Sequence, residues 1–211
     1  MHIQSVDDLI SLSTDGPEHA QAMAAYLRRD SAWLEVVAGI DSVIVRFDVI
    51  ATEASVARLR IEASLRAGVP PLPKSNEFLE IPIVYGGDYG PDLEALCHEL
   101  DLTEDEFIAL HSGAVYCVDM IGFTPGFVFL SGLDQTLQVP RRKEPRQRVE
   151  AGSVGIADGR TGLYPLASPG GWTLIGRTPY PLFDPKADNP FPLHAGMQIR
   201  FVAASADVFG T

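Results

Sequence analysis

The residues best suited to chemistry lie in the C-terminal half of the chain, where basic, glycine-rich and aromatic motifs follow one another. The segment Pro140–Arg148 reads PRRKEPRQR and carries five basic side chains, among them Arg141, Arg142 and Arg146. Arginine matches the geometry of carboxylate and phosphate groups, and two prolines stiffen the loop, so less entropy is lost on binding. A charge run is more often a solvated loop, but this composition favours a site for an anion or an acidic partner surface.

A second motif is rich in glycine. Residues 151–162 read AGSVGIADGRTG, with Ser153, Arg160 and Thr161 as polar groups between four glycines. The segment lacks the Gly-Lys-Ser/Thr ending of a Walker A loop, and no crossover helix follows, as a dinucleotide-binding fingerprint requires. Two readings stay open, a loop that lets a ligand approach the backbone and a set of glycine-rich barrel strands.

Two further motifs combine glycine with aromatic residues. Residues 166–183 read LASPGGWTLIGRTPYPLF and place Ser168, Gly170 and Gly171 directly before Trp172. Arg177 follows as a candidate anion ligand, although a core tryptophan beside a β-bulge is the alternative. Residues 122–127 read GFTPGF and put two phenylalanines around a Pro-Gly turn, which suits either a binding turn or a hydrophobic plug.

The titratable and metal-binding residues indicate no assembled catalytic centre. The five histidines are scattered, and no catalytic triad can be placed. His111, at the end of a predicted helix, is the best candidate for a catalytic histidine, although a lone histidine is more often structural. Cys97 and Cys117 have no histidines at ligand spacing, so we expect no metal site.

The scaffold that the sequence predicts is of the α+β class. Strands at 3–11, 33–38, 42–49 and 78–85, with helices at 20–29 and 53–67, form a ferredoxin-like βαββαβ pattern and predict a domain over 1–85. A second domain is predicted over 86–211. It begins with an acidic helical hairpin at 88–112, in which Thr103 and Glu106 form a capping box. From Ala114 onward, short apolar runs punctuated by glycine predict a closed or nearly closed β-barrel.

Composition excludes several classes of partner. The net charge is −12, and acids dominate residues 1–120, so nucleic acid is not an expected partner. The apolar runs are too short for a membrane span, and the N-terminus lacks the basic region of a signal peptide. With two cysteines and no export signal, we expect a cytoplasmic protein with reduced thiols.

Taken together, the motifs resemble the KipI-like proteins, also described as allophanate hydrolase subunit 1 or as the B subunit of 5-oxoprolinase. The similarity is dense over residues 81–184 and weak over 1–80, where only the order of elements agrees. The resemblance implies a ferredoxin-like domain followed by a cyclophilin-like β-barrel. It also implies two partners, a KipA-like paralogous barrel subunit and a LamB/YcsF-type subunit. Such a complex uses ATP to open the small-molecule amide 5-oxo-L-proline, a lactam, to L-glutamate, and this chain is expected to be inactive alone.

The resemblance also assigns expected roles to residues. We predict catalytic roles for His111, Arg142 and Ser153. The predicted substrate-binding residues are Phe123, Pro125, Gly126, Arg141, Arg146, Thr161, Ser168, Gly170, Gly171, Trp172 and Arg177. In such a barrel, residues 168–172 would form a strand-entry turn at a cleft, where the glycines let a substrate or partner reach the backbone. The family commonly has glutamine where this chain has Arg160, which is charged and only donates hydrogen bonds.

Three other functions remain open from the sequence. A carboxyltransferase-type component of a urea carboxylase or allophanate hydrolase-like system would need a biotinylated partner, because this chain has no Met-Lys-Met biotin acceptor. A KipI-type inhibitor of a histidine kinase would bind its target without catalysing a reaction. A prolyl isomerase is suggested by barrel analogy alone and ranks last.

Overall fold

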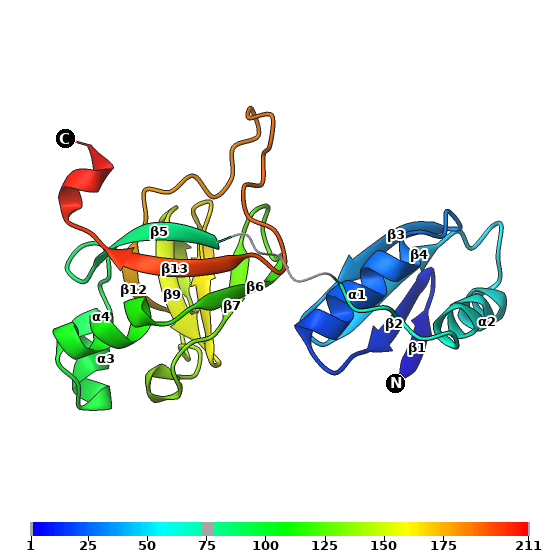
Figure 1. Ribbon diagram of the computed structural model, residues 1–211, viewed down its shortest axis with the longest axis horizontal. Coiled ribbons are helices and arrows are strands. Elements are labelled where there is room, and N and C mark those ends of the chain that lie inside the picture. The colour runs from blue at the N-terminus through cyan, green and yellow to red at the C-terminus, as the bar shows by residue number, and fades with distance from the viewer. Residues whose placement is uncertain (1, 73–77, 211) are drawn as a thin grey trace. The chain divides into compact units, whose positions relative to one another are not determined.

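The computed structural model describes residues 2–72 and 78–210, and the chain divides into two compact units (Figure 1). Unit 1 is Met1–Lys74 and unit 2 is Ser75–Thr211. The predicted division between residues 85 and 86 is therefore wrong, because the strand before it belongs to the second unit. No helix among the described residues is both long enough and apolar enough to cross a membrane.

Unit 1 is an antiparallel sheet of four strands packed against helices. Its strand order is β1-β2-β4-β3. The predicted first strand is in fact a hairpin, because Asp7 has a φ of 49° and turns the chain between β1 and β2. Alternate residues of β2 and β4, such as Ile10 and Val45, pack with Met23 and Leu27 in one core. The elements are β1 Ile3–Val6, β2 Leu9–Ser13, α1 Pro17–Leu27, β3 Trp33–Ala38, β4 Ser42–Phe47 and α2 Ala54–Leu65.

The predicted ferredoxin-like arrangement is not formed, because the fourth predicted strand lies in the other unit. β5, Phe78–Tyr85, pairs in parallel with β13, Gln198–Ala203, and antiparallel with β12, Thr173–Arg177. Its residues Ile81 and Ile83 are fully buried in the core of unit 2. The order of elements in unit 1 is thus ββαββα. Hydrophobic alternation correctly predicted a strand but carries no information on which sheet the strand joins.

Unit 2 is a closed barrel with the strand order β10-β7-β6-β13-β5-β12-β9, which confirms the predicted barrel. Figure 1 shows β5 and β13 side by side across the front of the barrel. Asp158 and Gly159 have φ values of 50° and 74° and form the two-residue turn between β9 and β10, where an Asp-Gly pair is favoured. The remaining barrel strands are β6 Tyr116–Ile121, β7 Val128–Ser131, β9 Ser153–Ala157 and β10 Arg160–Leu163.

The acidic helical hairpin is present as predicted. The amide of Glu106 donates to the Thr103 hydroxyl at 3.2 Å, and the Thr103 amide donates to the Glu106 carboxylate at 2.8 Å, which completes the capping box. The apolar side of the hairpin, including Leu93, Leu96 and Phe107, joins the barrel core. The helices are α3 Leu93–Leu100 and α4 Glu104–Gly113; unit 2 also contains a ribbon of β8 Arg146–Val149 with β11 Ser168–Gly170, and short 3-10 turns η1 Gln135–Leu137 and η2 Ala206–Phe209.

Candidate functional site

The glycines around Trp172 make room for side chains of the protein itself. Trp172 is only 6% exposed and packs with Phe127 and Phe129 in a small second core of unit 2. A Cβ on Gly162 would lie 2.8 Å from the rings of Phe127 and Trp172, and one on Gly155 would lie 3.0 Å from the Trp172 Cβ. The reading in which Trp172 is a core residue therefore holds, and these two glycines are explained by packing.

Gly170 is explained in the same way, whereas a Cβ on Gly171 would lie no closer than 3.6 Å to its neighbours. A Cβ on Gly170 would overlap the Tyr164 ring, and burial raises the pKa of Tyr164 to about 12. The carbonyl of Gly171 accepts a hydrogen bond from the Arg142 amide at 2.8 Å. The predicted access of a ligand to this backbone is thus replaced by internal contacts. The hydroxyl of Ser168 is buried with no hydrogen-bond partner among the described residues.

The basic loop is held by a carboxylate that sequence analysis did not single out. Asp92, just before α3, accepts from Arg142 at 3.1 Å and from both Nη atoms of Arg146 at 2.9 and 2.6 Å. It also accepts from the amide of Leu174 at 2.7 Å, and its own amide donates to the Leu174 carbonyl. Arg142, predicted as catalytic, and Arg146, predicted to bind substrate, are therefore both paired with a carboxylate of the chain itself.

Three more arginines of these motifs have carboxylate partners. Arg141 pairs with Asp158 at 2.8 Å, and Arg148 pairs with Glu150 at 2.7 Å. Arg160 pairs with the buried Asp119 at 3.4 Å. The basic loop is therefore largely neutralised by the protein's own acids.

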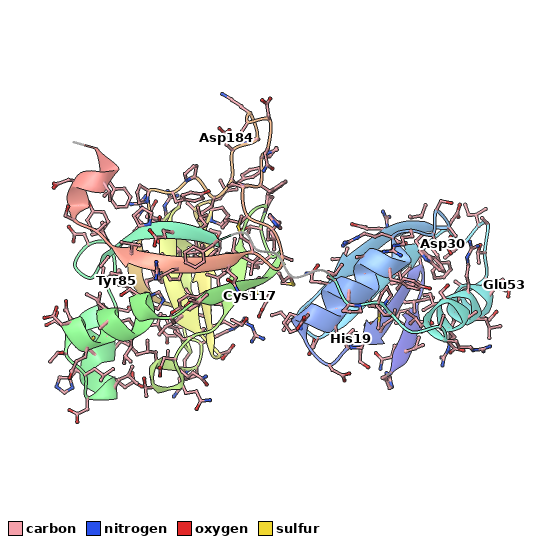
Figure 2. The ribbon with its side chains drawn as sticks, in the orientation of Figure 1. His19, Asp30, Glu53, Tyr85, Cys117 and Asp184 are labelled. Carbon is pink, nitrogen blue, oxygen red and sulfur yellow. The ribbon has the colours of Figure 1, made fainter. Side chains whose placement is uncertain are left out.

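Of the three predicted catalytic residues, His111 lies within the barrel core. It is fully buried and stacks on Phe201; its Nδ1 lies 2.7 Å from the Tyr85 hydroxyl and its Nε2 lies 3.2 Å from the Thr161 hydroxyl. Figure 2 labels Tyr85 at the end of β5. Burial lowers the pKa of His111 to about 3, so the ring is neutral near pH 7. His111 and Thr161 line neither of the two cavities of unit 2 that are described below.

Arg142 and Ser153 do not form a catalytic group with His111. Ser153 is buried at the start of β9 and is the β-sheet partner of Arg177, whereas Arg142 lies at Asp92. No hydrogen bond links the three residues in the part of the chain that the structure describes. Within residues 2–72 and 78–210 there is also no cluster of three or more histidine, cysteine or acidic residues that could bind a metal ion.

Arg177 differs from the other arginines of unit 2. Its Nε donates to the carbonyl of Ala151 at 2.7 Å, and its guanidinium lies over the ring of Phe209 with 5.7 Å to the centroid. Among the described residues, no carboxylate lies within ion-pair distance of it. The pKa of the nearby Glu150 is lowered mainly by the hydrogen bond from its partner Arg148 and to a smaller extent by the charge of Arg177. Among the described residues of this unit, Arg177 is thus the arginine that has no carboxylate partner.

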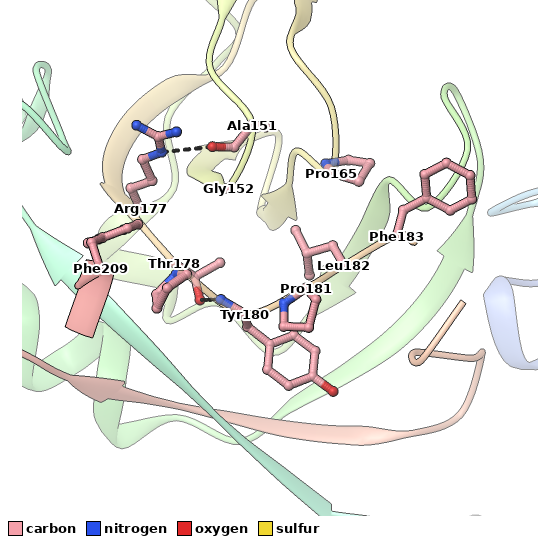
Figure 3. A pocket seen from close by; sticks show the side chains of 11 residues that line it. Ala151, Gly152, Pro165, Arg177, Thr178, Tyr180, Pro181, Leu182, Phe183 and Phe209 are labelled. Atoms are coloured by element: carbon pink, nitrogen blue, oxygen red, sulfur yellow. Dashed lines mark hydrogen bonds between the residues drawn. The ribbon is translucent and has the colours of Figure 1, made fainter. Parts of the chain in front are cut away.

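Arg177 lines a cavity of about 240 Å³ (Figure 3). The other walls are mostly proline and aromatic, and Figure 3 shows Arg177 with Phe209 at one end and Phe183 at the other. The solvent-facing part of this lining is more polar than apolar, so it suits a small polar molecule with one anionic group. The lining residues are Ala151, Gly152, Pro165, Arg177, Thr178, Pro179, Tyr180, Pro181, Leu182, Phe183 and Phe209.

The GFTPGF motif borders the same cavity. Gly126, with a φ of 81°, packs so closely that a Cβ would lie 2.8 Å from the Cβ of Phe183. Phe123 also has a positive φ, 73°, and is 68% exposed, with only an edge contact to Phe127. Pro125 is exposed as well. The motif therefore combines a fixed inner half with an exposed aromatic tip.

A second cavity of about 240 Å³ lies beside the basic loop and has mixed charge. Asp92 and Glu99 come from the helical hairpin, and Arg141 and Arg142 come from the loop. Thr173 of β12 completes the polar lining. Because Asp92, Arg141 and Arg142 are already paired, the Arg177 cavity is the better candidate for an anion site.

The fold and these cavities define a β-barrel unit with an arginine in the lining of a surface cavity. The chain belongs to the carboxyltransferase domain family, subdomain C and D, whose model matches residues 8–193. It is 50% identical over 131 residues to the B subunit of 5-oxoprolinase from Escherichia coli O157:H7, covering 62% of this chain and 60% of that protein. It is 38% identical over 187 residues to the B subunit of 5-oxoprolinase from Haemophilus influenzae (strain ATCC 51907 / DSM 11121 / KW20 / Rd), covering 89% and 87%.

Solved structures show the same fold. A crystal structure of a protein named TTHA0988 matches with a TM-score of 0.80 and 30% identity, over 97% of this chain and 40% of that one. The Kluyveromyces lactis urea carboxylase matches with a TM-score of 0.77 and 18% identity, over 97% of this chain and 22% of that one, which shows the fold alone. The chain thus spans about 60% of the length of the Escherichia coli relative and less of these two larger structures.

Proposed function

We propose that this chain is a subunit of an ATP-dependent 5-oxoprolinase that opens 5-oxo-L-proline to L-glutamate. The support from comparison is the identity of 38% over most of the Haemophilus influenzae relative and 50% to part of the Escherichia coli one, both named as the B subunit of 5-oxoprolinase. The proposed partners are a KipA-like barrel subunit and a LamB/YcsF-type subunit, and the proposed location is the cytoplasm.

The observation that carries the proposal is the Arg177 cavity. 5-Oxo-L-proline is a small lactam ring that bears one carboxylate. The Nη edge of Arg177 can donate two parallel hydrogen bonds to a carboxylate, and the walls, which include Pro165, Pro181 and Phe183, can contact the ring. The role proposed for this chain is to bind and orient the substrate, which lowers the entropic cost of the reaction at its carbonyl.

The described residues do not offer a comparable site for the phosphates of ATP. A phosphate site needs several donors aimed at one point, and the arginines of the basic loop are paired with Asp92, Asp158 and Glu150. We therefore assign no step through ATP to this chain and propose that ATP is bound by one of the partner proteins. This assignment agrees with the expectation that the chain alone is inactive.

Reconstitution tests the proposal. The chain is co-expressed with the KipA-like and LamB/YcsF-type proteins of the same genome, and ATP-dependent release of L-glutamate from 5-oxo-L-proline is measured with each component omitted in turn. We expect release only when all components are present. Release of L-glutamate by this chain alone would contradict the multi-subunit proposal. Absence of release by the full set of proteins would contradict the proposed substrate.

A second candidate is a carboxyltransferase-type component of a larger enzyme. The matched family model is that of a carboxyltransferase domain, and the fold is shared with the Kluyveromyces lactis urea carboxylase. The same co-expressed assembly can be given a carboxylated biotin protein and urea. Transfer of the carboxyl group, without glutamate release from 5-oxo-L-proline, would replace the first candidate by the second.

A further inference from the structure

Phe209 is the one residue of η2 that lines the Arg177 cavity. Its ring stacks on Tyr89 at 4.9 Å between centroids with an interplanar angle of 14°, and the Arg177 guanidinium lies over its ring. The other residues of η2, Ala206 to Val208, are exposed, and the hydrogen bonds of the turn are local, from Val208 to Ser205 and from Gly210 to Asp207. The Phe209 ring is therefore the main anchor of η2 in the described part of the chain.

The contacts of Arg177 restrict how a ligand can approach it. The Ala151 carbonyl occupies Nε, and Cζ of the guanidinium lies 5.7 Å from the centroid of the Phe209 ring. A planar carboxylate can lie in the guanidinium plane and bind both Nη atoms. A phosphate would gain no additional donors at this edge, because its remaining oxygens project out of that plane.

We infer that Phe209 determines the specificity of the Arg177 cavity. Its ring holds the guanidinium in place and forms part of the cavity wall. The cavity therefore selects small molecules in which a carboxylate is attached to a compact ring. This inference rests on the proposed function for its substrate class. It assigns to Phe209 a role in binding and selection, and no role in the chemical step.

The kinetic test uses the reconstituted enzyme with Phe209→Ala, Phe209→Leu and Tyr89→Ala. Loss of the cation–π contact and of the wall should raise KM for 5-oxo-L-proline by about 5- to 10-fold with Phe209→Ala while kcat changes little. Phe209→Leu keeps an apolar side chain in the wall but has no aromatic ring, so its KM should lie between those of wild type and Phe209→Ala. Preference for 5-oxo-L-proline over its six-membered homologue, 6-oxopiperidine-2-carboxylate, should fall in the same order. Tyr89→Ala, which removes the support of Phe209, should raise KM by a smaller factor.

A matched control is Phe78→Ala, because Phe78 lies under Arg200 at 5.3 Å in a similar pair and does not line the cavity. It should leave KM unchanged. Unchanged KM and unchanged substrate preference in Phe209→Ala, in an enzyme that is active as wild type, would overturn the inference.

A second readout does not depend on the reaction. Phenylglyoxal modifies accessible arginines, and peptide mass spectrometry of the chain alone reports its rate at Arg177. Phe209→Ala should increase that rate several-fold, whereas Phe78→Ala should not change it. Equal rates in wild type and Phe209→Ala would overturn the inference even if no glutamate is released, so its failure is distinct from failure of the proposed function.

Discussion

Replacing Asp92 by alanine tests whether its ion pairs with Arg142 and Arg146 stabilise the basic loop. The change leaves two guanidinium groups without their carboxylate and the amide of Leu174 without its acceptor. Breaking a fully buried ion pair costs about 3–5 kcal/mol. The side chain of Asp92 is 11% exposed, but those of Arg142 and Arg146 are 39% and 25% exposed and can partly rehydrate. We therefore expect a loss of about 2–3 kcal/mol in the free energy of unfolding of unit 2.

The assay is urea unfolding followed by tryptophan fluorescence in a Trp33→Phe background. The chain has two tryptophans, one in each unit, so Trp172 then reports on unit 2 alone. The midpoint should fall with little change in the denaturant dependence. The matched control is Glu80→Ala, because the Glu80–Arg200 pair is about half exposed on both sides and should contribute about 0–1 kcal/mol. Equal losses in the free energy of unfolding in the two variants would refute the description of Asp92 as a buried, stabilising ion-pair partner.

Three further predictions concern packing, acid and helix capping. Gly162→Ala should destabilise unit 2 by about 1–3 kcal/mol, because its Cβ would meet the rings of Phe127 and Trp172; an unchanged thermal midpoint would contradict this packing. Below about pH 6.5 the unfolded chain protonates His111, whereas the buried ring stays neutral to about pH 3. The contribution of His111 to the free energy of unfolding is therefore intact above pH 6.5 and decreases by at most about 1.4 kcal/mol per pH unit as the pH falls to 3. His111→Gln should flatten the profile of stability against pH between pH 3 and 6.5. A profile identical to that of wild type would contradict this prediction. Thr103→Ala removes the capping box and should cost about 1 kcal/mol in urea unfolding, with Thr136→Ala as an exposed control; equal midpoints would contradict a stabilising cap.

Local signals predicted the elements well. The Thr103 capping box, the Asp158–Gly159 turn and the run of short strands are each determined by neighbouring residues, and all three are present. The membership of β5 could not be predicted, because Ile81 and Ile83 alternate as they would in either sheet. Its pairing with β12 and β13, both far later in the chain, determines which sheet it joins.

The site was predicted in part. Arg177 was selected from the sequence, and it lines the cavity. Asp92 was missed because its partners Arg142, Arg146 and Leu174 are 50 to 82 residues away and nothing local distinguishes it from neighbouring acids. Phe209 was missed for the same reason.

For the glycine-rich motif at 151–162 the sequence left two readings open, and Gly170 was predicted to bind substrate. Glycine also permits close packing of the protein's own rings, and sequence density does not separate the two uses. At Gly155, Gly162 and Gly170 the close neighbours are Trp172 and Tyr164.

The central claim is that Arg177 binds the carboxylate of 5-oxo-L-proline, and steady-state kinetics of Arg177→Ala in the reconstituted enzyme tests it most directly. Loss of a charged hydrogen-bonding group of about 2 kcal/mol corresponds to an increase in KM of roughly 30-fold, with a much smaller change in kcat. Arg200→Ala, which removes a surface arginine paired with Glu80, is the control and should behave as wild type. A KM for Arg177→Ala equal to that of Arg200→Ala would contradict the account.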